Sequence, residues 1–555
     1  MEIDRRTFTK GTVALAASSA IGGRAAAQLA PMLSPQQRAV GAIEDYADAH
    51  RRWFGLPGMT LSVTSPSGFS SVVNTGFANL DTRTPYTADT LIQIGSISKS
   101  LTSAVLHQFV AEGRLKLSDR ITAILPRTPL PAGSPIEVQH LLDHVAGLPG
   151  DPALFVRGGL WTAYAPGKHW HYSNTGYDLL GHLAEHIGGK PLDRILAERL
   201  FSPLGMIRSR GALKAADRLL YAQGYEPADL SIPFLRGTPL RPAAWVDSTS
   251  AAGSTASTAA DMIRYLQGIA GAARGSGGMG LGPKPALAWA SHSVPSDSPE
   301  MRYGNGLMHV EDKGRRYIHH TGGMVSFSSS FHVDTGNGIG SFASTNFSAF
   351  PEYRPRKVTM FAVQALAAAE AGQPVPDPPS LESIVKQPGD YLGRFANGSR
   401  AFEVRGGSAL SIVSNGSTAA LEPGGEDLFV TAHPDFRNFT LKFERSNKAI
   451  VGASWGSDSF VRDGAAMHIP PSNPELARLA GHYYNDSPWW PPVVVVERAG
   501  KLWLGTETPL TPVGKNLWRV GDDNWSPERV SFADVMNGKP QTFVFSGTEF
   551  SRQDV

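Results

Sequence analysis

Ser96 and Lys99 are the first residues whose types and spacing could do chemistry. The apolar stretch Leu91–Ile94 and the turn residue Gly95 precede a run from Ser96 to Leu106 that reads as a helix. Ser96 would lie at the helix N-terminus, where unpaired N–H groups favour negative charge and could stabilise an oxyanion. Lys99 follows one turn later on the same face, so its amine could accept the hydroxyl proton if burial lowered its pKa. Alone, this short Ser-x-x-Lys motif is weak evidence, and in a long chain it more often marks a capping serine and a solvated lysine.

Further motifs follow in order along the chain. They are His140 to Pro149 (HLLDHVAGLP), Pro166-Gly167, Tyr172-Ser173-Asn174, Pro203 to Met206 (PLGM), Ser257 to Met262, Tyr303 to Gly306 and His320 to Gly323 (HTGG). Each motif is weak evidence by itself, but the set in this order and spacing is specific. Over about residues 35–370 the chain resembles the serine β-lactamase and penicillin-binding peptidase family, on its class C side.

The resemblance implies a catalytic role for four residues. Ser96 would be the acylated nucleophile. Lys99 and Tyr172 would share the general acid/base work, first passing the serine proton to the leaving group and later activating water. His320 would complete the catalytic set. No metal and no organic cofactor is implied.

The resemblance also implies how the substrate is held. Asn174 would hydrogen-bond the substrate amide. The backbone N–H groups of Ser96 and Gly323 would form the oxyanion hole. The substrate would lie against an edge strand that contains Thr321 and Gly322.

Each of these assignments has a structural alternative. Tyr172 could be a half-buried aromatic residue whose hydroxyl is satisfied within the fold. Asn174 could be a turn residue, and His320 could be a structural histidine. The presence of every partner motif in order favours the functional interpretation.

Two pairs of histidines near the motifs need an interpretation. His140 and His144, four residues apart on an expected helix, could be a metal pair, but no supporting carboxylate arrangement accompanies them. We therefore expect packing or supporting roles for both. His169 and His171, on either side of Trp170, could tune the site or lie on the surface.

One departure from the family pattern bears on the substrate. The third motif of classical β-lactamases begins with lysine, whereas here it begins with His320. A histidine is mostly neutral at pH 7 and is poorly suited to gripping a substrate carboxylate. Histidine at this position resembles D-aminopeptidases and D-amino-acid amidases. The C-terminal repeats described next, each of the size of a small β-barrel, are a further similarity. D-Aminopeptidases of this family carry two such barrels after the catalytic domain, and a barrel loop reaches the active site.

The region after the catalytic domain repeats itself. A proline-rich spacer at residues 372–380 ends the first domain, and short alternating apolar runs then indicate β-structure. The triplets 393–395 and 481–483 correspond, and a set of five residues recurs at identical internal spacing: Leu421, Pro423, Gly425, Leu428 and Phe429 match Leu510, Pro512, Gly514, Leu517 and Trp518. Each copy has the size of one small barrel.

The resemblance and the repeat together predict an α+β fold. The catalytic domain, residues 34–371, would be an antiparallel sheet with flanking helices and a helical subdomain between Ser96 and the His320 strand. The active site would lie at their junction. Two small lipocalin-like antiparallel β-barrels would follow, at residues 381–465 and 473–555.

The N-terminus predicts export. Residues 1–27 contain Arg5-Arg6, a mildly apolar run and Ala25-Ala26-Ala27, which resembles a twin-arginine signal peptide and implies a periplasmic location. The alternative is an ordinary basic helix. No segment approaches the length of a membrane span, so we expect no stable membrane insertion.

Composition narrows the partners. The 555 residues carry 51 lysines and arginines against 49 acids, a net charge of +2, which gives no electrostatic reason to expect nucleic acid. The absence of cysteine excludes disulfides, zinc–thiolate sites and cysteine nucleophiles. The expected partner is a small peptide, amide or ester substrate, and a homodimer stays open.

The predicted function is a serine peptidase or amidohydrolase that forms an acyl-enzyme on Ser96 and cleaves peptides or amino-acid amides, as D-aminopeptidases do. The first alternative is a β-lactamase or carboxylesterase on the same scaffold. The second, from another class, is a non-catalytic penicillin-binding protein. Because Lys99 and Tyr172 are both present, the sequence favours an enzyme.

Overall fold

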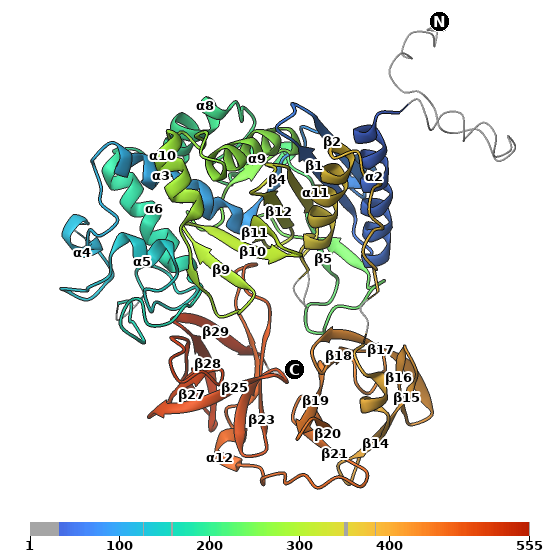
Figure 1. The fold of residues 1–555 in the computed structure, drawn as a ribbon. Coiled ribbons are helices and arrows are strands. Elements are labelled where there is room, and N and C mark those ends of the chain that lie inside the picture. The colour runs from blue at the N-terminus through green and yellow to red at the C-terminus, as the bar shows by residue number, and fades with distance from the viewer. Residues whose placement is uncertain (1–32, 126, 157–158, 349–352, 383–384, 554–555) are drawn as a thin grey trace, which may run out of the picture.

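The chain forms a sheet-and-helix domain followed by two β-barrels (Figure 1). The computed structural model describes residues 33–125, 127–156, 159–348, 353–382 and 385–553. The expected signal peptide, residues 1–27, lies outside them. Within the described ranges, no helix is both long and apolar enough to cross a membrane.

The centre of the first domain is a nine-stranded antiparallel sheet with the strand order β3-β2-β1-β13-β12-β11-β10-β9-β8. Its first and last strands in the chain, β1 and β13, pair side by side in the middle. The strands are β1 (Gly58–Thr64), β2 (Ser70–Asn79), β3 (Thr84–Pro85), β8 (Val294–Pro295), β9 (Met301–Gly304), β10 (Leu307–Asp312), β11 (Arg315–Gly323), β12 (Ser328–Asp334) and β13 (Gly340–Thr345).

Helices cover both faces of this sheet, and the central strands β1, β12 and β13 are buried along their whole length. The helices α2 (Pro35–Phe54) and α11 (Arg356–Glu370) pack on one face, and α9 (Ala259–Ala273) packs on the other. The start of α2 is fixed by a capping box, in which Ser34 and Gln37 bond each other's backbone N–H. Apolar residues of α2 such as Ile43 and Tyr46 then face the sheet.

A helical subdomain lies between Ser96 and the His320 strand, as the sequence predicts (Figure 1). Its elements are α3 (Ser98–Ala111), α4 (Ile121–Ile124), α5 (Val138–Leu142), α6 (Asn174–Gly188), α7 (Leu192–Leu196), the π-helical η3 (Ala197–Phe201), α8 (Ser202–Leu204), the 3-10 turn η4 (Ala215–Leu220) and α10 (Pro283–Ser291). Two small ribbons accompany them: β4 (Ile92–Gln93) with β7 (Ala256–Ser257), and β5 (Tyr225–Pro227) with β6 (Leu240–Pro242).

The C-terminal repeats form two closed eight-stranded antiparallel barrels, which confirms that part of the predicted fold. After the turn η5 (Pro388–Tyr391), the first barrel contains β14 (Gly393–Ala396), β15 (Ala401–Gly406), β16 (Leu410–Ser414), β17 (Ser417–Gly425), β18 (Leu428–Val430), β19 (Leu441–Ser446), β20 (Ala449–Trp455) and β21 (Asp458–Arg462). After α12 (Pro474–Ala477), the second contains β22 (Gly481–Tyr484), β23 (Val493–Arg498), β24 (Lys501–Leu504), β25 (Thr508–Gly514), β26 (Leu517–Val520), β27 (Arg529–Met536), β28 (Lys539–Phe545) and β29 (Thr548–Gln553).

The repeated residues occupy equivalent places in the two barrels. Between β17 and β18 the register shifts between Pro423 and Gly425, and between β25 and β26 it shifts between Pro512 and Gly514. A bulge bends a strand and increases its local twist, which helps a small sheet to close. The identical spacing in sequence therefore reflects the same bulge at equivalent strand pairs of the two barrels.

The strand that carries the HTGG motif differs from its prediction. The prediction of an edge strand is wrong for β11 as a whole, because β11 lies between β12 and β10. The two ladders differ in length, however. Pairing with β10 ends at His319, whereas pairing with β12 continues to Gly323. The last four residues of β11 therefore keep one flank outside the β10 ladder, toward the start of α3.

Candidate active site

Ser96, the predicted nucleophile, lies in a tight turn that requires glycine. Gly95 has φ 56°, and a Cβ atom there would lie 2.7 Å from the backbone nitrogen of Gly323. A Cβ at Gly322 would lie 1.8 Å from the carbonyl oxygen of Ile94. This close approach places Ser96, in the 3-10 turn η2 (Gly95–Ile97), beside the end of β11. The two backbone segments predicted to supply the oxyanion hole are therefore adjacent.

Lys99 lies on the first turn of α3, a helix whose residues Ser98 to Phe109 are all buried. Its Nζ is 3.1 Å from Ser96 Oγ, 2.6 Å from Asn174 Oδ1 and 2.9 Å from the carbonyl oxygen of Ala252. The last two atoms can only accept hydrogen bonds. In a neutral Lys99 the two amine hydrogens go to these acceptors, which leaves the lone pair facing the Ser96 hydroxyl.

Burial prepares Lys99 for this role. Complete burial lowers the pKa of its amine to about 7, although the charges of Asp178 and Asp151 oppose that shift. Near neutral pH a substantial fraction of the amine is thus unprotonated and able to accept a proton. The charged form is also accommodated, because Nζ lies 4.7 Å from the ring centroid of Tyr172.

Tyr172 belongs to the loop just before α6, and its ring packs against the buried His144. It directly precedes Ser173, the N-cap of α6, whose Oγ accepts a hydrogen bond from Gly176 N at 3.0 Å. The ring of His144 packs 4.3 Å from the Tyr172 ring, and His144 Nδ1 accepts from Ser173 N at 3.1 Å. Burial lowers the pKa of His144 well below its usual value, so it packs as a neutral ring. His144 therefore supports the position of Tyr172, in line with the supporting role predicted for it.

His320 is buried, and both of its ring nitrogens have partners. Nδ1 lies 2.6 Å from the carbonyl oxygen of Thr321 and so donates to it, while Nε2 lies 3.2 Å from the hydroxyl of Tyr303. Burial lowers the pKa of His320 to about 3. The HTGG motif therefore contributes no cation to the site at His320. The ring centroids of His320 and Tyr172 are 6.5 Å apart.

The predicted substrate-binding residues lie around the same point. Asn174 is the first residue of α6, and its amide is engaged on both sides: Oδ1 accepts from Lys99, and Nδ2 donates to Asp151 Oδ1 at 2.6 Å. Thr321, Gly322 and Gly323 end β11. The structure thus brings together all eight residues that the sequence singles out.

Three acidic residues of the site were not predicted. Asp178, on α6, accepts from Ser250 Oγ at 2.6 Å and raises the pKa of Lys99. Asp151 bonds Asn174. Glu528 comes from the second barrel. Asp151 directly follows the HLLDHVAGLPG stretch, which is the one sequence signal that could have revealed it.

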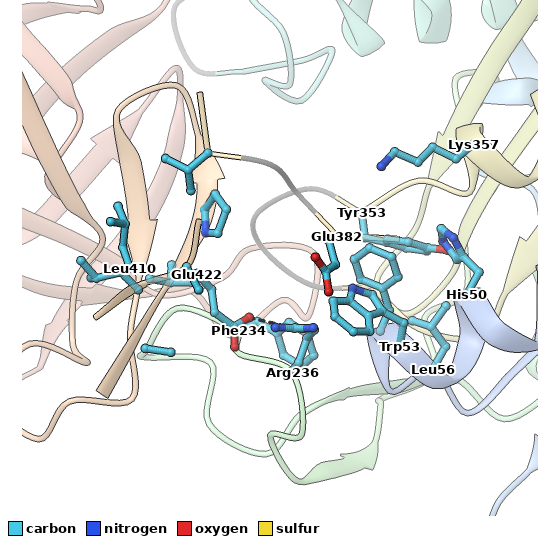
Figure 2. A pocket seen from close by; sticks show the side chains of 18 of the residues that line it. His50, Trp53, Leu56, Phe234, Arg236, Tyr353, Lys357, Glu382, Leu410 and Glu422 are labelled. Carbon is cyan, nitrogen blue, oxygen red and sulfur yellow. Dashed lines mark hydrogen bonds and ion pairs between the residues drawn. The ribbon is translucent and has the colours of Figure 1, made fainter. Parts of the chain in front are cut away.

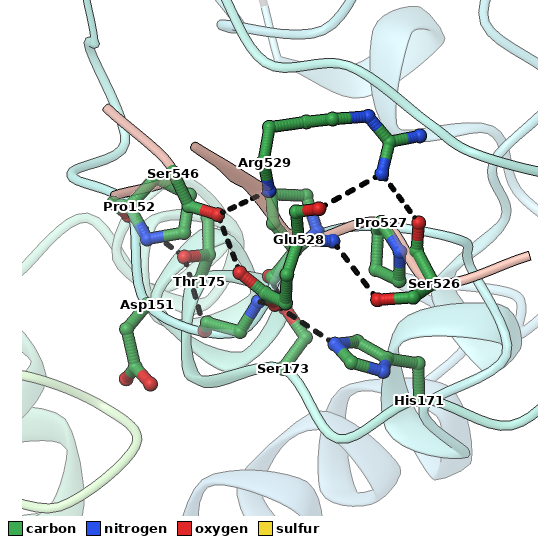
Figure 3. Close-up of polar contacts among 12 residues, drawn as sticks. Asp151, Pro152, His171, Ser173, Thr175, Ser526, Pro527, Glu528, Arg529 and Ser546 are labelled. Carbon is green, nitrogen blue, oxygen red and sulfur yellow. Dashed lines mark hydrogen bonds and ion pairs between the residues drawn. The ribbon is translucent and has the colours of Figure 1, made fainter. Parts of the chain in front are cut away.

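The second barrel contacts the loop that carries Tyr172 (Figure 3). Glu528, just before β27, accepts from His171 Nε2 at 2.9 Å and from Gly150 N at 2.6 Å, and it also accepts from Ser546 Oγ. Although burial alone would raise it, these hydrogen bonds hold the pKa of Glu528 below its usual value. Nearby, Trp525 stacks on His169 with ring centroids 4.8 Å apart. The barrel thus contacts residues that are next to Asp151 and Tyr172 in the chain.

The comparisons with known proteins agree with this geometry. A family model described as Beta-lactamase matches residues 39–364, more than half of the chain. The chain belongs to this family. Members of the Beta-lactamase family are serine hydrolases, and the arrangement around Ser96 is consistent with that chemistry.

Relatives within the family carry different names. A protein named Beta-lactamase from Pseudomonas fluorescens is 30% identical over 224 residues, 38% of this chain and 59% of the relative. A D-aminopeptidase from Brucella anthropi is 35% identical over 155 residues, 24% of this chain and 29% of the relative. The chain thus spans less than two thirds of the length of these curated relatives. A D-amino acid amidase from Ochrobactrum anthropi SV3 superposes with a TM-score of 0.51 at 25% identity, over 60% of this chain and 99% of that one.

Among the described residues, no group of three or more histidine and acidic side chains is placed to hold a metal ion. His140, predicted to pack, accepts a hydrogen bond from Glu137 N at the start of α5, at 3.1 Å. His144, the other histidine of this pair, accepts a hydrogen bond from Ser173 N.

A cavity of about 600 Å³ lies apart from this site, between the catalytic domain and the first barrel (Figure 2). Arg236 crosses it, with its guanidinium 4.2 Å from the ring centroid of Trp53 and 3.0 Å from Glu422 of β17. None of the eight predicted site residues lines this cavity. Its ion pair and aromatic walls form the junction between the two domains.

The hydrogen bonds of Glu528 to Gly150 and His171 predict that a mutation in the second barrel affects the site. We expect Glu528→Gln to lower kcat/KM about 5- to 30-fold, because losing the charge weakens the bonds that hold the Tyr172 loop. Steady-state kinetics with an aminoacyl p-nitroanilide would measure it. Glu549→Gln, at an exposed position on the same barrel, is the matched control. Equal kinetics for both variants would show that the contact does not support the site.

Proposed function

We propose that this protein is a serine peptidase or amidohydrolase that forms an acyl-enzyme on Ser96 and cleaves peptides or amino-acid amides, in the manner of D-aminopeptidases. The observation that carries the proposal is the surroundings of Lys99. Its amine lies 3.1 Å from Ser96 Oγ, and the carbonyl oxygens of the Asn174 side chain and of Ala252 take up its hydrogens. Such a lysine acts as a general base toward the serine hydroxyl.

The reaction would proceed in two halves. Lys99 takes the proton of Ser96 as Oγ attacks the carbonyl carbon, and the oxyanion is stabilised by the backbone N–H groups of Ser96 and Gly323. The amine leaving group departs with a proton delivered through Lys99 and Tyr172, which leaves an ester on Ser96. A water molecule then attacks this ester, gives its proton to the same pair, and the carboxylate product leaves as the Ser96 hydroxyl is restored.

The peptidase assignment rests on the charge of the cleft. A lysine in place of His320 would offer a cation to a substrate carboxylate, but His320 is neutral and both of its nitrogens are bonded within the protein. Substrates with a free C-terminal carboxylate gain nothing from this residue. Relatives named D-aminopeptidase and D-amino acid amidase support the same choice.

Incubation with D- and L-aminoacyl amides, read by intact-protein mass spectrometry and product release, tests the proposal. We expect a covalent acyl adduct that peptide mapping locates on Ser96, and turnover of at least one amide series. Hydrolysis of cephalosporins or simple esters with no amide turnover would contradict the peptidase assignment.

The pKa of Lys99 predicts the pH dependence of acylation. Only the neutral amine accepts the serine proton, so kcat/KM should rise about tenfold per pH unit below pH 7 and level off above it. His144 and His320, which face the same amine, stay neutral across this range because burial lowers the pKa of each. A profile of kcat/KM against pH would measure this rise, which is the acid limb of the profile.

Asp178→Asn provides the control for this assignment. The Asp178 carboxylate stabilises the Lys99 ammonium, so its removal should move the acid limb to lower pH. A limb that stays in place, or moves to higher pH, would show that another group titrates.

A second candidate function is β-lactam or ester hydrolysis by the same serine. The observation that favours it is the 30% identity with a protein named Beta-lactamase. A chromogenic cephalosporin distinguishes the two candidates, because efficient turnover would favour the β-lactamase. A stable adduct on Ser96 without turnover of any substrate would instead indicate a non-catalytic penicillin-binding protein.

A further inference from the structure

Asp151 places a carboxylate beside the catalytic hydrogen bonds. Its Oδ1 accepts from Asn174 Nδ2 at 2.6 Å, and the same Asn174 side chain accepts from Lys99 Nζ at 2.6 Å. Lys99 in turn lies 3.1 Å from Ser96 Oγ. One amide group thus separates the Asp151 carboxylate from the general base.

The Asp151 carboxylate is accessible, and it has no permanent cationic partner. The residue is exposed, and Figure 3 shows its carboxylate pointing away from Glu528 and Ser546. Among the described residues, no lysine or arginine forms an ion pair with it. Surrounding protein nevertheless desolvates the group and raises the pKa of the Asp151 carboxyl, while Asn174 and Lys99 counter that effect. When Lys99 is neutral, the other charged groups that act on the Asp151 carboxyl are Glu528, which raises its pKa, and His171, which lowers it.

The chemistry of an aminoacyl substrate matches this position. In an aminoacyl amide the α-nitrogen is two bonds from the reacting carbonyl carbon, a separation of about 2.5 Å. When the carbonyl carbon is within reach of Ser96 Oγ, the α-nitrogen must therefore lie within a few ångströms of the nucleophile. Hydrogen bonds connect this point to Asp151 through Lys99 and Asn174. Charge-assisted hydrogen bonds to an ammonium are stronger than those to a neutral N–H.

We propose that Asp151 binds the free α-ammonium group of the substrate's first residue and thereby selects aminoacyl substrates over N-acylated ones. This inference rests on the proposed function and names the residue that makes the enzyme an aminopeptidase. A β-lactam side chain or an internal peptide bond offers a neutral N–H at this place, so it gains less from the carboxylate.

The neighbouring carboxylates are less suited to the role. Both oxygens of Glu528 accept hydrogen bonds from protein groups, and its side chain is only 13% exposed. Asp297 is exposed and interacts electrostatically with His171 and Asp523, but it forms no bond to Asn174.

The test compares alanine p-nitroanilide with its N-acetyl derivative, in whichever stereochemical series the wild-type enzyme prefers. We expect the wild type to favour the free amine. Asp151→Asn, which keeps an acceptor for Asn174, should lower the ratio of kcat/KM values for free amine over N-acetyl substrate about tenfold or more. Most of the loss should appear as a higher KM for the free amine.

Asp297→Asn is the matched control and should keep the wild-type ratio. If the ratio is unchanged in Asp151→Asn, or falls in Asp297→Asn instead, the inference is overturned. Labelling of Ser96 by an activated aminoacyl ester is followed by mass spectrometry in parallel. A labelled enzyme with an unchanged ratio refutes only the role of Asp151, whereas an enzyme that no ester or amide labels refutes the proposed function as well.

Discussion

Replacement of Ser96 by alanine is expected to abolish the acyl adduct and to reduce kcat/KM at least about ten-thousandfold. The hydroxyl is the only group of this residue that can form the ester, and removing the nucleophile of a serine hydrolase removes nearly all of its covalent catalysis. Intact-protein mass spectrometry and steady-state rates with the preferred aminoacyl amide would measure both effects.

The fold of the Ser96→Ala variant should be unchanged, because the substitution removes only a small hydroxyl, which lies 3.1 Å from Lys99 Nζ. Its thermal transition serves as the control. Peptide mapping of the wild-type adduct adds a second check, since Ser98 lies two residues away but bonds Gly95 O and Thr255 N within the protein. An adduct on Ser98, or one that persists in Ser96→Ala, would refute the assignment of the nucleophile.

The second large effect is expected for Lys99→Arg, which should lower kcat/KM about a thousandfold. A guanidinium has a pKa above 12 and does not accept the serine proton, so the variant keeps a positive charge but loses the general base. The pH–rate profile should lose its limb near pH 7, which a change in packing alone would not cause.

Lys190→Arg is the matched control for Lys99→Arg, because Lys190 is exposed and pairs with Glu198 at 2.7 Å. It should behave as the wild type. If Lys99→Arg kept more than about a tenth of the activity, Lys99 would not be the base, and Tyr172 would have to take the proton unaided.

The core of the site could be predicted because it is built from local motifs. Ser96 and Lys99 lie three residues apart across the junction of η2 and α3, and Ser173 caps the helix whose first residue is Asn174. In each case a short stretch of chain fixes the relative positions of two functional groups. The barrels were predictable for a similar reason, since Pro423 and Pro512 mark the same bulge in two copies.

The rest of the site depends on contacts between distant parts of the chain. Glu528 lies 357 residues after His171, and no periodicity or spacing connects them. Asp151 is a single acid after a turn, and its role follows only from where Asn174 points. The prediction of an edge strand failed for a related reason. A motif specifies the residues of β11, whereas the length of its ladder with β10 is set by another segment.

The flank of β11 that lies outside the β10 ladder bears on which substrates such an enzyme could accept. A peptide that adds to residues 320–323 as a further strand would be held through its main-chain groups, which are the same for every sequence. Recognition of this kind tolerates many side chains but is sensitive to chain direction and to handedness, because inverting one α-carbon moves its side chain to the other face of the added strand. We therefore expect selectivity to be strong for the terminus and chirality of the substrate and weak for the identity of its residues.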